Sequence, residues 1–317
     1  MARLFRRLPD SSPRGVQYLA TIETALTTDS CVVFGAAREA QFPVAQRPLT
    51  LATAAFGRVR YELDSRSIAV DDDGFLILNA GQVHGCTIQA AEPVENLQFY
   101  FHADMLYDVL HASTLPFETL LDRAPETRSS GFEFFQELTR RERVVSPVLR
   151  YIRHCILSQA VSDEWLEEQV HYLLHRMLLQ QRHTIQRELR IDCARPATRA
   201  ELRRRAARVA DYIDSNFEQD FGLRELARIA CLSRFHLLRL FRRIYGVTPQ
   251  AYKLQKRMRV ARRLLESRKM SRAEVAAQVG YGTRTSLWIL MQRLEASGAG
   301  FAASPIPQAH IQKLATS

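Results

Sequence analysis

Cysteine is scarce in this 317-residue chain, and its placement excludes two kinds of site. The five cysteines are odd in number, widely scattered and never in CxxC spacing. A disulfide framework needs an even set and a zinc cluster needs ligands in close pairs, so neither fits. We expect Cys31, Cys86, Cys155, Cys193 and Cys231 to be small apolar residues buried in a reducing compartment.

Long apolar runs are also absent. No segment approaches the roughly 18 apolar residues of a membrane span, and Pro9 and Asp10 interrupt the basic start of the chain before it could form a signal peptide. Hydrophobic residues at 46% and charged residues at 25% are typical of globular proteins. The length suits two domains of about 150 residues each. We expect a cytoplasmic protein with no membrane partner.

Positive charge is plentiful but confined to one segment. Residues 201–296 hold 21 Lys/Arg and 9 Asp/Glu, a formal charge of +12, whereas the whole chain carries +10, so the remainder sums to −2. Cations that neutralise phosphates release counterions and thereby bind polyanions. Charge alone leaves two interpretations open, a nucleic-acid-binding segment and a solvated arginine-rich helical face.

The N-terminal third has the pattern of an antiparallel sheet. Short β-rich stretches alternate with turn residues such as Asp73-Gly74 and Asn79-Ala80-Gly81, which predicts a small β-barrel or sandwich. The expected strands are Cys31–Gly35, Phe56–Leu63, Phe75–Asn79, Cys86–Ala90 and Leu97–His102.

From about Ala103 the apolar period becomes helical. The clearest helix begins near Ser162, a suitable N-cap that is followed by an acidic first turn. Its single apolar stripe consists of Leu166, Val170, Leu173, Leu174, Met177 and Leu178. The stripe could pack on its own β-domain or on the same helix of a second subunit, so a homodimer is one expectation.

A polar stretch between residues 182 and 198 is the expected interdomain linker. Pro196 disfavours a helical conformation at Arg195. The expected segments are a sensing or dimerisation domain at 1–190 (barrel about 30–102, helices about 103–184), a linker at 191–198, a helical domain at 199–296 and an atypical tail at 297–317.

The helical domain contains an internal repeat with a helix-turn-helix pattern. In the first copy, residues 223–230 predict a short helix, 231–233 a turn, and Ser233 the cap of a second helix that turns Leu237, Leu240 and Phe241 inward. Arginine can bind guanine edges and phosphates, and an aromatic ring can contact thymine methyl groups. The residues expected at a major groove are Ser233, Arg234, Phe235, His236, Leu238, Arg239, Arg242 and Arg243.

The second copy starts at Ala273 and repeats the small-residue spacing of Ala227 and Cys231 at Ala276 and Gly280. Residues 250–267 between the copies predict one helix of about 27 Å at 1.5 Å per residue. That length is comparable with the ~34 Å turn of duplex DNA, so the two copies could enter successive major grooves. The residues expected to contact DNA from the second copy are Thr283, Arg284, Thr285, Ser286 and Trp288.

These motifs resemble the DNA-binding domain of the AraC/XylS family over roughly residues 205–293. The resemblance rests on Phe241-Arg-Arg243, Gly246-Val-Thr-Pro249 with Tyr252, the arginine-rich helix, and Glu274-Val-Ala-Ala-Gln-Val-Gly-Tyr281, in that order. It implies a transcriptional regulator of double-stranded DNA in which the outward residues meet bases, Arg239 foremost. RNA polymerase is a further possible partner by the same resemblance.

The β-rich segment resembles the sensor domain of the same family through residues 75–84 and the strand at 97–101. This implies an α+β protein, with a cupin-like antiparallel β-barrel and helices before an all-α domain of two helix-turn-helix motifs. It also implies control by a small-molecule effector, whose identity the sequence does not give, or by dimerisation. No cofactor is implied.

The second copy departs from the family pattern. Leu287, Ile289 and Met291 stand where the family usually has Phe, Arg and Phe, and an unrelated tail follows. Trp288 and Ile289 would then face the groove. A reading-frame change and a tail refolded over this apolar run would each account for the departure, and both remain open.

The sequence can also be compared with the requirements of two other classes of function. A cupin-type metal enzyme needs two or three histidines and a carboxylate, usually beginning with His-x-His, whereas here His84 stands with Cys86 and His102 comes much later. A turn or core histidine is therefore the favoured interpretation of His84, and no metal site or enzyme is expected. No P-loop, GxGxxG or Ser/His/Asp order occurs. An interaction module with a degenerate second DNA-reading helix is the other alternative.

Overall fold

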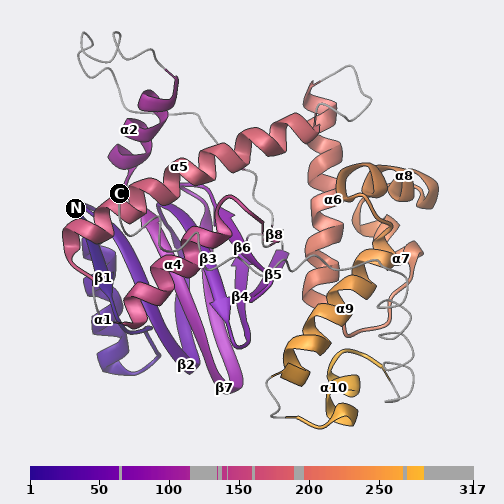
Figure 1. Cartoon of the computed structure of the whole chain (residues 1–317), viewed down its shortest axis with the longest axis horizontal. Helices are drawn as coiled ribbons and strands as arrows, with labels where there is room; N and C mark the ends of the chain where they lie inside the picture. Colours follow the sequence, from indigo (N-terminus) through magenta and orange to yellow (C-terminus); the bar gives the residue numbers. More distant parts are fainter. Residues whose placement is uncertain are drawn as a thin grey trace, which may run out of the picture. The chain divides into compact units, whose positions relative to one another are not determined.

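The computed structural model describes most of the chain as a mixed α+β fold, with a sheet in the N-terminal part and helices in the C-terminal part (Figure 1). The described residues are 1–63, 66–114, 134, 138–140, 142–158, 161–188, 196–266 and 270–281. They divide into unit 1, Met1–Asn216 with Phe221–Ala251, and unit 2, Phe217–Asp220 with Tyr252–Ser317.

An eight-stranded sheet forms the N-terminal part. Its strands are β1 (Ala2–Phe5), β2 (Ser30–Gln46), β3 (Leu49–Ala55), β4 (Arg58–Leu63), β5 (Arg66–Asp71), β6 (Gly74–Leu78), β7 (Val83–Phe101) and β8 (Leu138–Arg140). The order is β1-β2-β7-β3-β6-β8, and β4 joins β5 to β7. All pairs are antiparallel except β1 with β2, so the expectation of a purely antiparallel sheet is wrong at this edge.

Strand β7 corrects the prediction of separate strands at Cys86–Ala90 and Leu97–His102. It runs unbroken through Pro93, a residue that cannot donate a ladder hydrogen bond. The register with β2 shifts between Ala37 and Glu39, opposite the segment that holds Pro93. Because a bulge leaves residues unpaired, it accommodates the proline without ending the strand.

Other N-terminal elements were missed or misplaced. Strand β4 begins at Arg58 because Phe56 has a φ of 64° in the turn before it, which excludes Phe56 and Gly57 from the predicted strand. The sequence prediction also lacked β1, β3, β5 and helix α1 (Pro13–Ala25), although α1 carries clear start signals. Ser12 accepts a hydrogen bond from the Gly15 N–H, and Pro13 occupies the first turn.

The two faces of the sheet carry two separate cores. Neighbouring residues alternate between them, so Val32 and Phe99 belong to one cluster while Val33 and Tyr100 belong to the other. The first cluster packs against α2 (Ala103–Thr114), α4 (Ser146–Leu157) and α5 (Asp163–Glu188), and the second includes residues of α1. The sheet therefore has buried side chains on both faces, and Figure 1 shows α4 and α5 in front of one of them.

The apolar stripe of α5 packs against the sheet. Ser162 accepts a hydrogen bond from the Trp165 N–H at 3.3 Å, as a cap at this position requires. All six stripe residues are buried in the core that α5 shares with the sheet. The interpretation that the stripe packs on its own β-domain is therefore confirmed, and the stripe is not available to a second subunit.

The C-terminal helices are α6 (Pro196–Asn216), α7 (Leu223–Ile229), α8 (Arg234–Tyr245), α9 (Pro249–Glu266) and α10 (Arg272–Gln278). Because α5 extends to Glu188 and α6 begins at Pro196, residues 196–198 of the predicted linker are helical. None of the helices among the described residues has the length and apolar character of a bilayer-spanning segment.

The cysteines are only partly buried, contrary to the prediction. Cys31 and Cys86 are buried, Cys155 is half-buried and Cys231 is exposed. Cys193 lies outside the described residues.

Candidate nucleic-acid interface

The candidate interface begins with a tight turn between α7 and α8. Leu226, Ala227 and Ala230 are buried, and the Leu232 N–H donates to the Ala227 carbonyl at 3.0 Å, which closes the turn. Cys231 takes a φ of 49°, in the left-handed region. Cys231 thus lies in the turn that follows α7, and α8 begins three residues later at Arg234.

Helix α8 is fixed at both ends. The Ser233 side chain accepts a hydrogen bond from the His236 N–H at 3.2 Å, so the predicted cap is confirmed. At the other end Gly246 has a φ of 77° and its N–H donates to the Arg242 carbonyl. The chain then starts α9, because Thr248 accepts from the Ala251 N–H and Pro249 occupies the first turn.

The inner face of α8 is buried and its outer face is open. Leu237 and Phe241 are fully buried and Leu240 is nearly so, as predicted. The outward side chains that the sequence predicted are exposed, apart from Leu238, which is half-buried. With 69% of its surface accessible, Phe235 is one of the most exposed large apolar residues described. Burial on one side thus sets the rotation of α8 and presents the other side to a partner.

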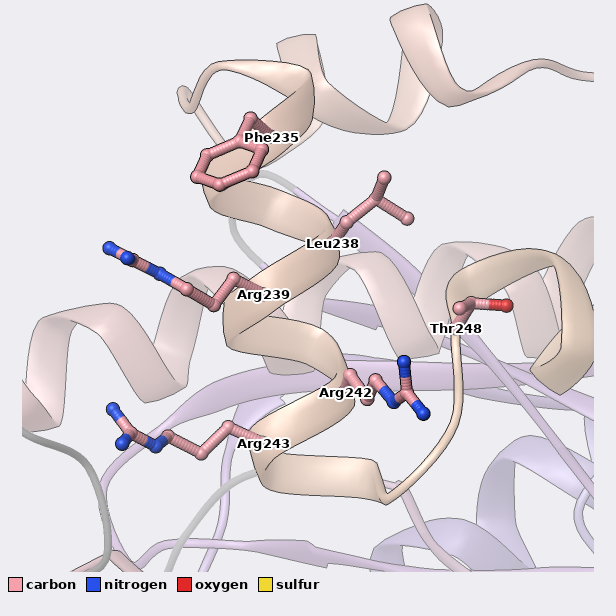
Figure 2. A pocket seen from close by; sticks show the side chains of 6 residues that line it. All are labelled: Phe235, Leu238, Arg239, Arg242, Arg243 and Thr248. Carbon is pink, nitrogen blue, oxygen red and sulfur yellow. The ribbon is translucent and has the colours of Figure 1, made fainter.

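Figure 2 shows the reading face, which we define as the surface formed by Phe235, Leu238, Arg239, Arg242, Arg243 and Thr248. These six residues line a shallow hollow. The Arg239 guanidinium carbon lies 5.7 Å from the centre of the Phe235 ring, within the range of a cation–π contact. This contact restrains Arg239 while leaving its N–H groups directed outward.

Two arginines of the reading face, Arg239 and Arg242, keep their charge available to a partner. In the part of the chain that the structure describes, neither Arg239 nor Arg242 has a carboxylate partner. Arg242 and Arg243 also lie in the last turn of α8, where a cation suits the helix dipole. Paired outward arginines beside an aromatic ring are suited to phosphates and guanine edges.

Thr248 is a member of the reading face that the sequence prediction missed. It lies beyond the end of α8 and was noted only as part of the Gly-Val-Thr-Pro motif. Its use as a helix cap was readable from the following Pro249, but its position beside Arg242 depends on the tertiary turn.

The second copy is described only in its first half. Helix α10 starts with a capping box, in which Ser271 and Glu274 each bond the other's backbone N–H. Val275, Ala276 and Val279 are buried against residues of α9. The predicted contact residues Thr283, Arg284, Thr285, Ser286 and Trp288 lie outside the described residues, as does the apolar run at 287–291.

No metal centre is found among the described residues, in which no group of three His, Cys, Asp or Glu side chains could hold an ion. His84 is 2% exposed and its Nδ1 lies 3.1 Å from the Gln82 carbonyl oxygen. Burial, with a smaller contribution from the Arg47 charge, lowers the pKa of His84 to about 4. The interpretation of His84 as a core histidine is confirmed.

Comparisons with known proteins agree with this geometry. Residues 226–295 match a family model described as a helix-turn-helix domain. The probable transcriptional regulator LumQ of Photobacterium leiognathi is 28% identical over 86 residues, which cover 27% of this chain and 35% of LumQ. The match thus spans about a third of that protein's length.

Two solved structures are also similar. The DNA-binding domain of AdpA, a global transcriptional factor crystallised with a target DNA, is 30% identical; the match covers 28% of this chain and 79% of that chain, with a TM-score of 0.27. The AraC-like transcriptional activator CuxR is 14% identical over 89% of both chains, with a TM-score of 0.32. The C-terminal part of the chain thus carries an AraC-type helix-turn-helix domain, similar to that of a transcriptional regulator.

Proposed function

We propose that the chain is a sequence-specific regulator of transcription that inserts α8 into the major groove of double-stranded DNA. One observation carries the proposal: α8 is buried along one side and open along the other, and the open side holds unneutralised arginines beside an exposed aromatic ring. A helix of this kind supplies the donors that base edges and phosphates accept.

Individual roles follow from position on α8. Arg239 lies in the middle of the exposed side and is restrained by Phe235, so it is the base reader. Arg234, Arg242 and Arg243 lie towards the two ends and are suited to flanking phosphates. Ser233 and His236 are exposed at the start of α8, and Leu238 provides an apolar contact.

The proposal extends to a second reading helix. Helix α9 has 18 residues, enough to separate two recognition helices by nearly one turn of DNA, and α10 has the start of a second helix-turn-helix motif. Thr283, Arg284, Thr285, Ser286 and Trp288 would contact the second groove. In this proposal the two motifs enter adjacent major grooves of the duplex.

The N-terminal part is the proposed sensor. Its sheet, covered on both faces, is compatible with a cupin-like barrel that responds to a small molecule. A cytoplasmic location, a homodimer and contact with RNA polymerase belong to the same proposal by family resemblance.

Selection from a random pool of duplex DNA by the full chain tests this function. We expect enrichment of a motif that the Arg239→Ala/Arg242→Ala double variant does not select. Arg60→Ala, which removes an exposed arginine from β4, is the control and should select the wild-type motif. Failure of the wild-type chain to enrich any sequence would contradict the proposal.

A further inference from the structure

Two strands at the edges of the sheet are capped by side chains of α6 rather than by another strand. Within the described chain, β5 pairs with β4 alone and β8 with β6 alone. The Ala69 N–H of β5 donates to Ser215 Oγ at 3.1 Å, and the Leu138 N–H of β8 donates to Asp211 Oδ1 at 3.3 Å. An open strand edge otherwise leaves such N–H groups without a protein partner.

Two ion pairs also join β5 and β8 to α6. Arg66 Nη1 donates to Asp211 Oδ2 at 3.0 Å, and Arg140 Nη2 donates to Asp214 Oδ1 at 3.3 Å. Asp211 and Asp214 are 4% and 2% exposed, whereas the two arginine side chains remain about a quarter exposed. A buried carboxylate requires such partners because an unpaired buried charge is costly.

Another side of α6 is tied to the first helix-turn-helix motif. The Tyr212 hydroxyl donates to Glu225 Oε1 of α7 at 2.6 Å, and its ring lies 5.2 Å from that of Phe221. Arg205 donates to the Cys231 carbonyl, in the turn before α8, at 3.1 Å. Adjacent residues Asp211 and Tyr212 therefore connect the sheet and the motif through one turn of helix.

We propose that Asp211, Asp214 and Ser215, with their partners on β5 and β8, form a latch that couples the sheet to the reading face. The arginines of the reading face remain exposed, so the latch does not act by covering them. Coupling between two sites is reciprocal, so DNA bound at α8 stabilises the β5 and β8 edges, and a change in the sheet alters DNA affinity. The regulatory part of this inference rests on the proposed function.

Amide hydrogen exchange of the full chain, with and without its selected duplex, tests the latch. In the wild type, DNA should slow exchange in α8 and also in β5 and β8. In Asp211→Asn/Asp214→Asn, DNA should still slow exchange in α8 while the slowing in β5 and β8 is lost. The released arginines can turn to water because they are partly exposed, which favours folding of the variant.

A matched control removes two negative charges elsewhere. Glu39→Gln/Asp163→Asn changes the net charge equally at two exposed sites outside α6, so it should keep the wild-type slowing in the sheet. Ser215→Ala is a milder second variant. It removes only the hydrogen bond to Ala69, so DNA should no longer slow exchange in β5 but should still slow it in β8. Equal slowing in the sheet for the latch variant and the wild type would overturn the proposal.

A measurement without DNA separates failure of the latch from failure of the proposed function. Amides of β5, β8, α6 and α8 in the wild type should open at the same denaturant concentration, as parts of one cooperative unit do. In the latch variant, α6 and α8 should open at a lower concentration than β5 and β8. Separate opening in the wild type would rule out the latch, whether or not the chain binds DNA.

Discussion

Two arginines one turn apart on α8 occupy different positions relative to a groove. Arg239 lies at mid-helix beside Phe235, whereas Arg243 lies in the last turn. We expect Arg239→Ala to weaken binding to the selected site by about 1–3 kcal/mol and to relax preference at one base pair. Arg243→Ala should weaken binding to all duplexes alike. Titrations against selected and scrambled duplexes check this, and equal losses on both duplexes for the two variants would contradict the assignment of Arg239.

The buried His84 side chain should make the free energy of unfolding depend on pH. Its pKa is about 4 in the folded chain, against an ordinary value of 6.5, because burial disfavours the charged ring. Below pH 6.5 the unfolded chain takes up a proton that the folded chain does not, so stability falls as the pH decreases. The loss is about 2 kcal/mol from about pH 7 to about pH 5.

Denaturation midpoints at the two pH values measure this effect. His84→Gln should show a smaller decrease than the wild type. His102→Gln removes a histidine whose side chain is 28% exposed, and it should keep the full decrease. A decrease of the same size in His84→Gln and the wild type would show that other groups cause it.

At the scale of elements, two glycines have the same backbone conformation but different surroundings. Gly246 and Gly280 have φ of 77° and 78°. A Cβ on Gly246 would meet nothing within 4 Å, whereas a Cβ on Gly280 would lie 2.0 Å from the Glu218 carbonyl oxygen. Gly246→Ala should therefore cost about 1 kcal/mol from the backbone alone. Gly280→Ala should cost roughly 3 kcal/mol because the contact adds to that strain.

Chemical denaturation of the two variants checks this difference. The comparison isolates the close approach because the backbone cost is common to both. Equal destabilisation would contradict this prediction. It would mean that the backbone around Glu218 moves away from the new Cβ with no loss of folding free energy.

The same elements show what the sequence could and could not predict. The helix-turn-helix was readable because its signals are local: Ser233 caps α8, Gly246 ends it, and the apolar spacing between them names the buried side. The sheet was less readable because pairing is not local. The sequence pattern divided β7 into two strands, and only the register with β2 shows one strand with a bulge opposite Pro93. Thr248 lies on the reading face because the turn after α8 brings it beside Arg242, and this position could not be predicted from the local sequence pattern.

Across the molecule as a whole, fewer basic side chains of residues 201–296 are available to DNA than their formal charge of +12 suggests. Arg203, Lys253 and Lys256 are buried. Arg257 donates to the carbonyls of Phe217, Glu218 and Gln219, at the end of α6, with distances of 2.6 to 3.2 Å. These cations stabilise the protein, so the number of phosphates neutralised is smaller than the count of basic residues suggests.

Salt dependence separates structural cations from DNA-binding ones. Binding of the full chain to duplex DNA should weaken steeply as salt rises, with a logarithmic slope of about −0.9 for each phosphate neutralised. Arg242→Ala should reduce the magnitude of that slope by about one, because Arg242 is exposed on the reading face. Arg257→Met should leave the slope unchanged and lower the denaturation midpoint, because three carbonyls lose their donor. A smaller slope in Arg257→Met, with stability unchanged, would place Arg257 on the DNA and not at the end of α6.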